Sequence, residues 1–99
     1  MIKVDLKDRV VIVTGGGGAI GSAMAHQLAA NGAKVVVAGR TIATLQKTVD
    51  EVTAAGGVAA AVVTDVSDKQ SAAQMVEKTV GLFGRLDVLV NNAGINGGE

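Results

Sequence analysis

Residues 10–21 read Val-Val-Ile-Val-Thr-Gly-Gly-Gly-Gly-Ala-Ile-Gly, and this stretch decides the fold. Its first four residues are apolar and β-branched with no polar alternation, which predicts a strand buried on both faces of a parallel sheet. The glycines end that strand, and residues 19–31 then show helical spacing of the residues taken as its apolar stripe: Ile20, Ala23, Met24, Gln27 and Leu28. A glycine-rich turn that opens a helix presents free backbone N–H groups and the positive end of the helix dipole to a ligand. The stretch therefore predicts a strand–turn–helix unit that can bind a phosphate group.

The same alternation continues along the chain. Three more segments rich in apolar residues, at residues 34–38, 58–63 and 86–90, predict strands. A helix with Thr41 as its N-cap is expected to run up to Gly56, and another is expected to open at Ser67, with Gln70 completing a capping box, and to stop at Gly84. The predicted order is β-α-β-α-β-α-β. It implies an α/β fold with a doubly wound parallel sheet of four strands, covered by three helices on its two faces.

Composition narrows the class of protein. The 99 residues carry nine basic and nine acidic side chains, so the chain lacks the basic excess of a nucleic-acid-binding surface. It contains no cysteine, which excludes disulfides and thiolate chemistry, and its His, Asp and Glu residues show no metal-ligand spacing. Residues 1–9 are too charged for a signal peptide, and no apolar run approaches the ~20 residues of a membrane span. We expect one cytoplasmic domain without a membrane segment.

The glycine turn fits more than one pattern. Gly16, Gly18 and Gly21 satisfy the G-x-G-x-x-G pattern of dinucleotide sites, and their position after a strand and before a helix is the one that pattern requires. A P-loop would need a lysine directly after Gly21, where this chain has Ser22. A turn that binds no ligand is the remaining alternative.

Three motifs in register carry a resemblance to a known family. The segment Thr14-Gly-x-x-x-Ala19-x-Gly21, the pair Asp65-Val66 and the run Asn91-Asn92-Ala93-Gly94 resemble the cofactor motifs of the short-chain dehydrogenase/reductases, over residues 10–94. The resemblance implies a Rossmann-like sheet and an NAD(P)-dependent oxidoreductase. Such an enzyme reduces a carbonyl or oxidises an alcohol by hydride transfer.

The resemblance also implies roles for individual residues. The turn would hold the pyrophosphate and the nicotinamide ribose, Asp65 would accept a hydrogen bond from the adenine amino group, and Asn91 would lie near the adenosine ribose. Asp65 as a helix cap and Asn91 as a structural amide that bridges strand ends are the alternatives. The candidate cofactor-binding residues are Gly15, Gly17, Gly18, Ile20, Gly21, Arg40, Thr41, Asp65, Val66, Asn91, Ala93 and Gly94.

Arg40 bears on which cofactor binds. An NAD site has an acidic residue at the end of the second strand to hold the ribose hydroxyls, but this chain has Gly39-Arg40 there. A guanidinium at that point can pair with a 2′-phosphate, and Thr41 can add a hydroxyl. NADP(H) is therefore favoured, with NAD(H) as the alternative cofactor and an exposed loop arginine as the alternative role.

The catalytic pattern of the family is not found. The family uses a tyrosine activated by a lysine four positions on, together with a serine, and this chain contains no tyrosine. We expect residues 1–99 to be the N-terminal, cofactor-binding portion of a longer single-domain protein, with no catalytic residue and no turnover of its own. The longer protein would act on a small carbonyl or alcohol and form a homo-oligomer. A stand-alone NADP(H)-binding module without catalysis, and a structural remnant that binds nothing, are the alternatives.

Overall fold

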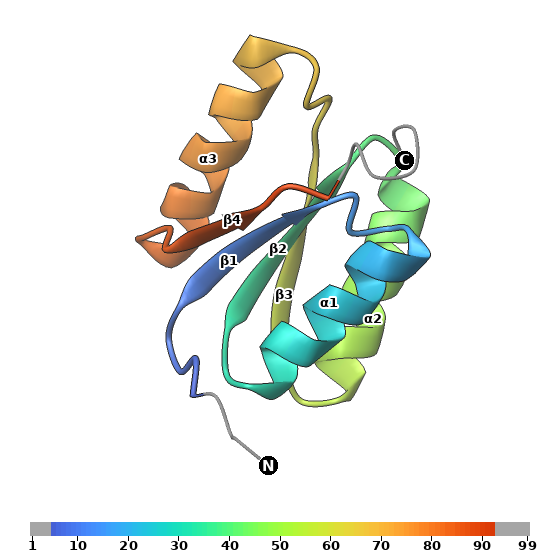
Figure 1. Ribbon diagram of the computed structural model, residues 1–99, viewed down its shortest axis with the longest axis vertical. Coiled ribbons are helices and arrows are strands. Elements are labelled where there is room, and N and C mark those ends of the chain that lie inside the picture. The colour runs from blue at the N-terminus through green and yellow to red at the C-terminus, as the bar shows by residue number, and fades with distance from the viewer. Residues whose placement is uncertain (1–4, 93–99) are drawn as a thin grey trace.

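The computed structural model describes residues 5–92, which form one α/β unit (Figure 1). The predicted alternation is confirmed, and the elements are β1 (Val10–Thr14), α1 (Ala19–Ala30), β2 (Lys34–Gly39), α2 (Ile42–Ala54), β3 (Val58–Val63), α3 (Lys69–Phe83) and β4 (Val88–Val90). Gly84 (φ +81°) is the C-cap of α3 and Gly32 (φ +100°) follows Asn31, the C-cap of α1, and both take the left-handed conformation expected of glycines that end helices.

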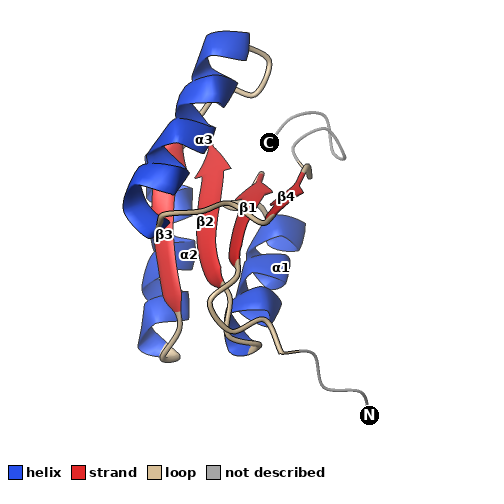
Figure 2. Ribbon diagram, turned by 90° about the vertical axis from the view of Figure 1, so that its left-hand side faces the viewer, coloured by secondary structure: helices blue, strands red, loops and turns tan. Residues whose placement is uncertain are grey.

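All four strands are parallel, and they lie in the order β3-β2-β1-β4. Val13 of β1 pairs with Val37 of β2 on one side and with Val90 of β4 on the other. Helices α1 and α2 cover one face of the sheet and α3 covers the other, so the predicted doubly wound, Rossmann-like arrangement is confirmed (Figure 2).

Residues 10–13 of β1 and 35–38 of β2 are all apolar because both faces of these strands are covered. Val11, Val13 and Val37 point into the layer beneath α1 and α2, whereas Ile12 and Val36 point toward α3. Each of these side chains is at most 2% exposed. A period-two alternation of side chains between two apolar layers leaves no position for a polar residue, which explains the unbroken runs in the sequence.

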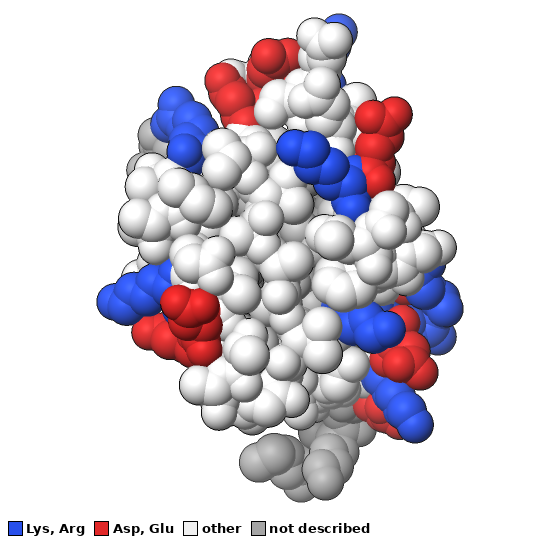
Figure 3. Space-filling model, turned by 180° about the vertical axis from the view of Figure 1, so that it is seen from behind, with Lys and Arg blue, Asp and Glu red and all other residues white. Residues whose placement is uncertain are grey.

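The outer strands are much less covered. Val63 of β3 is 52% exposed, and Val88 and Leu89 of β4 are each 49% exposed. Seen from behind, the molecule shows a broad uncharged centre with acidic and basic side chains around its rim (Figure 3). Within residues 5–92, the sheet thus ends in an apolar strand on each side.

An acidic residue at the opposite end of the sheet from the glycine turn ties β4 to β1. Asp87 accepts a hydrogen bond from the Val10 N–H (2.9 Å) and from the Arg85 guanidinium (2.7 Å), and Arg9 lies 3.5 Å away. The Asp87 N–H in turn donates to the Val10 carbonyl (2.9 Å). These contacts fix the register of β4, which is shorter than predicted because pairing with β1 as a strand begins only at Val88.

The rotation of α1 about its axis differs from the prediction. The stripe read from the sequence includes Ile20, Ala23 and Gln27, but Ile20 is 46% exposed and the other two are exposed as well. The buried residues are instead Gly21 and Ala25, with Met24 and Leu28 packed beside them. Contact between Gly21 and the glycine turn fixes this rotation, which a hydrophobicity count does not register. In the other two helices, the apolar residues Ile42 (53% exposed) and Val80 (43% exposed) also lie outside the buried face.

The predicted start of α3 is wrong by one residue. The N-cap is Asp68, whose side chain accepts hydrogen bonds from the N–H groups of Gln70 and Ser71. Ser67 does not cap this helix, since its hydroxyl donates to Asp65 Oδ1 at 2.6 Å. Asp65 is likewise not the helix cap that the alternative interpretation proposed.

Candidate dinucleotide-binding site

The glycine turn lies tightly against the strands and helices around it. Gly15 has φ +68°, a conformation that L side chains disfavour, and its N–H donates to the Ala38 carbonyl at 2.8 Å. A Cβ on Gly16 would come within 2.8 Å of Val37 Cγ1, and a Cβ on Gly21 would come within 2.7 Å of the Gly15 carbonyl carbon. Glycine is therefore required at these positions by packing of the chain on itself.

Gly17 packs directly against Thr44 of α2. A Cβ there would collide with the Thr44 hydroxyl and lie 2.9 Å from Thr44 Cβ. The turn is thus packed against the first turns of α2, and the buried Thr48 hydroxyl also donates to the Gly16 carbonyl at 3.0 Å. The atoms of a valine at Gly17 would therefore meet protein before they met a ligand, so this substitution would affect folding as well as binding.

The beginning of α1 leaves its backbone donors available. Gly18 is the N-cap, no side chain caps this end, and the first turn holds no acidic residue. The first N–H groups of a helix have no acceptor within the helix, and their dipoles sum to a partial positive charge. Ile20 lies in this first turn and is exposed. The geometry fits the pyrophosphate of a dinucleotide: a close, side-chain-free turn followed by uncompensated N–H donors.

A buried threonine joins the turn to the end of β4. Thr14 Oγ1 accepts a hydrogen bond from the Asn92 N–H at 2.8 Å. Its own proton has two acceptors in reach, the Val90 carbonyl (3.3 Å) and Asn91 Oδ1 (3.2 Å). Asn91 therefore contributes to joining the ends of β1 and β4, as its structural interpretation proposed. A role beside a ribose stays a prediction.

Asn92 carries a buried oxygen that meets no donor within the described part of the chain. The residue is 8% exposed, and its Oδ1 lacks a hydrogen-bond partner there. Such an atom is costly unless a donor reaches it. It lies at the edge of the sheet where the candidate site residues gather, although the sequence analysis did not select it.

Asp65 follows β3 at the same edge of the sheet. Its Oδ1 accepts from both the N–H (3.0 Å) and the hydroxyl of Ser67. These two hydrogen bonds, with a smaller contribution from the charge of Arg40, lower the pKa of the Asp65 carboxyl below its ordinary value. The carboxylate is therefore ionised at neutral pH and able to accept a hydrogen bond from an amino group. Val66 beside it is 42% exposed.

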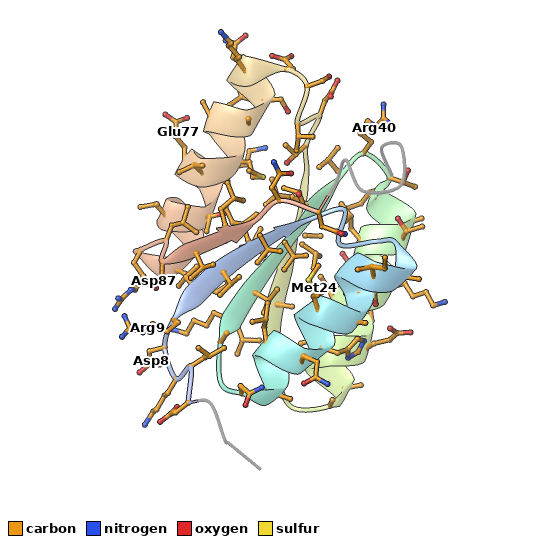
Figure 4. The ribbon with its side chains drawn as sticks, viewed as in Figure 1. Asp8, Arg9, Met24, Arg40, Glu77 and Asp87 are labelled. Carbon is orange, nitrogen blue, oxygen red and sulfur yellow. The ribbon has the colours of Figure 1, made fainter. Side chains whose placement is uncertain are left out.

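Arg40 and Thr41 lie between β2 and α2. Both are exposed, and Thr41 is the N-cap residue, as predicted, although its side chain makes no capping hydrogen bond. Figure 4 shows Arg40 beside the start of α2, at the far end of the sheet from Arg9 and Asp87. The guanidinium thus lies at the carboxyl end of the strands, on the same edge as the glycine turn and Asp65.

The structure gathers ten of the twelve candidate residues at the carboxyl ends of the four strands. Ala93 and Gly94 lie outside the described residues. Sequence reasoning missed Thr44 and Thr48, which hold the turn from α2. Thr48 gave a signal, because it is a polar residue between Leu45 and Val52 on the buried stripe of α2, and a hydroxyl there requires a partner.

Two further classes of site were sought in residues 5–92. No group of three or more His, Cys, Asp or Glu side chains in this part of the chain is placed to hold a metal ion. Among the same residues, no helix combines the length and the apolar character that crossing a bilayer requires.

A parallel sheet with a glycine turn between β1 and α1 and polar residues after β2, β3 and β4 defines a dinucleotide-binding unit of the Rossmann type. The sequence profile of the short chain dehydrogenases matches residues 9–99. The chain belongs to this family.

Known relatives agree with this assignment. The chain is 45% identical over 92 residues to the uncharacterised oxidoreductase UxuB of Bacillus subtilis. This alignment covers 93% of this chain and 33% of that protein. It superimposes on a short chain dehydrogenase from Mycobacterium avium with a TM-score of 0.85 and 48% identity, over 90% of this chain and 35% of that one. For the citronellol catabolism dehydrogenase AtuB of Pseudomonas aeruginosa the TM-score is 0.89 and the identity 37%, over 95% and 40% of the two chains.

The chain spans about a third of the length of the relatives that it matches. Family membership implies a cofactor of the NAD(P) type, and the turn, the α1 terminus and the carboxylate of Asp65 fit such a group. Neither the geometry nor the family assignment chooses between NADP(H) and NAD(H).

Proposed function

We propose that this chain is the cofactor-binding portion of an NADP(H)-dependent oxidoreductase that acts on a small carbonyl or alcohol. The observation that carries the choice of NADP(H) is Arg40, an exposed guanidinium at the end of β2 where a carboxylate would otherwise hold ribose hydroxyls. A planar guanidinium forms paired hydrogen bonds with a phosphate, and Gly39 supplies no opposing charge.

The described residues would share the work of binding. The N–H groups at the start of α1 neutralise the pyrophosphate, Arg40 and Thr41 hold the ribose phosphate, and the ionised Asp65 orients the adenine. The bound nicotinamide supplies or accepts the hydride. Reduction of a carbonyl also needs a positioned acid, which typically contributes ~10²–10⁴-fold, and this chain has no tyrosine to provide one. We therefore propose that residues 1–99 bind cofactor without turnover, and that a longer, cytoplasmic, homo-oligomeric protein completes the reaction.

Binding of the two cofactors to an Arg40→Asp variant tests this proposal. The substitution removes the cation and adds the acid of an NAD site. NADPH binding should weaken by about 1.5–3 kcal/mol, the worth of a charge-assisted contact, while NADH binding should stay the same or improve. Dissociation constants from calorimetry or nicotinamide fluorescence provide the measurement.

Lys78→Asp is the matched control, because it reverses an exposed charge on α3 away from the site. Equal losses of NADPH and NADH affinity in Arg40→Asp would remove Arg40 from the site. The alternative, a stand-alone binding module, would be favoured by two results together. These are tight binding of NADPH by the wild-type chain and absence of turnover in a longer form of the protein.

A further inference from the structure

A pocket of about 290 Å³ lies between the glycine turn and one side of α2. Gly17, Gly18 and Ser22 line it from the turn and α1, and Thr44, Lys47 and Glu51 line it from α2. Because Gly17 and Gly18 carry no side chains, nothing projects from the turn toward Lys47. The pocket therefore joins the proposed phosphate site to a cation that the sequence analysis did not consider.

The ammonium of Lys47 has no carboxylate partner within residues 5–92. Its natural partner on the helix would be Glu51, four residues later. However, Glu51 Oε1 lies 3.1 Å from Nε2 of His26 on α1, and this contact directs the carboxylate toward α1. Lys47 is exposed, and it forms no ion pair with any acidic side chain of the described residues.

The start of α1, which lines the same pocket, adds partial positive charge near Lys47. The first turn of α1 and the first turn of α2 contain no acidic residue, and no side chain caps either helix. The N-terminus of α1 and the Lys47 ammonium thus meet at one pocket, which Glu51 also lines, and Arg40 lies just before α2. An anion beside Lys47 and the first N–H groups of α1 would be attracted to both.

We propose that Lys47 is a specificity-determining residue that pairs with the 2′-phosphate of NADP(H) from the α2 side of the glycine turn. The proposal rests on the cofactor choice made above and adds a second cation to Arg40. Lys47 lies five residues after Ile42, about 7.5 Å along the helix axis. Arg40 precedes Ile42 by two residues, and both side chains are long, so Arg40 and Lys47 would hold one phosphate between them. The pyrophosphate instead faces the N–H groups of α1.

The test is a Lys47→Gln variant, which keeps an unbranched polar side chain, shorter by one atom, and removes its charge. Adenosine 2′,5′-bisphosphate and adenosine 5′-monophosphate serve as probes because they differ only in the 2′-phosphate, and NADPH and NADH are measured beside them. We expect about three- to tenfold weaker binding of the bisphosphate and of NADPH, the size of a partly exposed charge-assisted contact. Binding of the monophosphate and of NADH should stay within twofold.

Three controls sharpen the result. Lys78→Gln removes an exposed charge from α3 and should change none of the four affinities. Lys47→Arg should keep the preference for the 2′-phosphate. The difference between wild type and Lys47→Gln should shrink as salt is raised from about 0.05 M to about 0.5 M, because the contact is ionic.

The outcomes separate this inference from the proposed function. If wild type prefers NADPH and Lys47→Gln leaves that preference unchanged, or weakens NADH equally, the role of Lys47 is overturned and the proposed function stands. If wild type shows no preference for the 2′-phosphate, both fail. A selective loss that Lys47→Arg restores would establish the second cation.

Discussion

Two helical glycines allow a sharp test of why the turn needs glycine. Gly21 lies in α1 and Gly81 lies in α3. Alanine in a helix is favoured over glycine by about 0.5–1 kcal/mol. A Cβ at Gly81 would meet nothing within 4 Å, so Gly81→Ala should show this gain in full.

The same substitution at Gly21 should have the opposite sign. Its Cβ would lie 2.7 Å from the Gly15 carbonyl carbon and 2.9 Å from Gly16 Cα, and backbone atoms cannot rotate away. Overpacking of this kind costs about 1–3 kcal/mol, and we expect the upper end because α1 must move off the turn. After the gain in helix propensity, Gly21→Ala should be less stable than wild type by about 2 kcal/mol, so the two variants should differ by about 3 kcal/mol.

Urea unfolding followed by far-UV circular dichroism provides the measurement, since the chain has no Trp or Tyr and a single Phe. Both variants are compared with wild type in the 99-residue chain under the same conditions. The reasoning is refuted if Gly21→Ala is as stable as wild type or gains as much as Gly81→Ala. In that case the contact between α1 and the turn would not decide the rotation of the helix.

Two further predictions concern the ends of β4. The hydrogen bonds from Arg85 and Val10 hold the folded-state pKa of Asp87 below its ordinary value of about 3.9, so their stabilising effect is complete above about pH 4 and is lost as the pH falls through the folded-state pKa. In Asp87→Asn, Tm should therefore fall less steeply on acidification, and a slope equal to that of wild type would contradict the assignment. Thr14→Val should destabilise the fold by about 1–3 kcal/mol, because the buried Asn92 N–H loses its acceptor, whereas Thr14→Ser should keep most of the stability. Chemical unfolding of the two variants checks this, and equal stability of both would show that the hydroxyl is dispensable.

The fold could be predicted from sequence because the buried parallel strands carry a strong signal. Residues 10–13 and 35–38 have no polar position, and a glycine follows each run within two residues. The rotation of α1 could not be predicted in the same way. It depends on contact between Gly21 and backbone atoms of the turn, and glycine contributes nothing to a hydrophobic stripe. The prediction of the α3 N-cap was wrong for a local reason. Ser67 and Asp68 are both residue types that cap helices, but the Ser67 hydroxyl donates its hydrogen bond to Asp65 instead.

The candidate site could be located from sequence, but its α2 side could not. Residues that follow parallel strands meet at one edge of the sheet whatever the strand order, so Arg40, Asp65 and Asn91 were predictable together. The contacts that Thr44 and Thr48 make with the turn depend on how α2 packs on α1. The spacing of the motifs carries no information about how α2 packs on α1. Lys47 was missed for the same reason.

The strand order explains why the ligand would bind at β1 in particular. The chain moves outward from β1 to β2 and β3, and then returns to place β4 on the other side of β1. Helices α1 and α2 therefore cover one face and α3 the other, and the connections after β1 and β4 diverge at the carboxyl edge. Thr14 spans this point, since its hydroxyl joins the end of β1 to the residues that follow β4. A change at Thr14 would thus alter both the start of the glycine turn and the position of Asn91. The family motif carries a threonine directly before its first glycine, and this double contact gives that threonine a physical role beside a turn that otherwise needs only backbone.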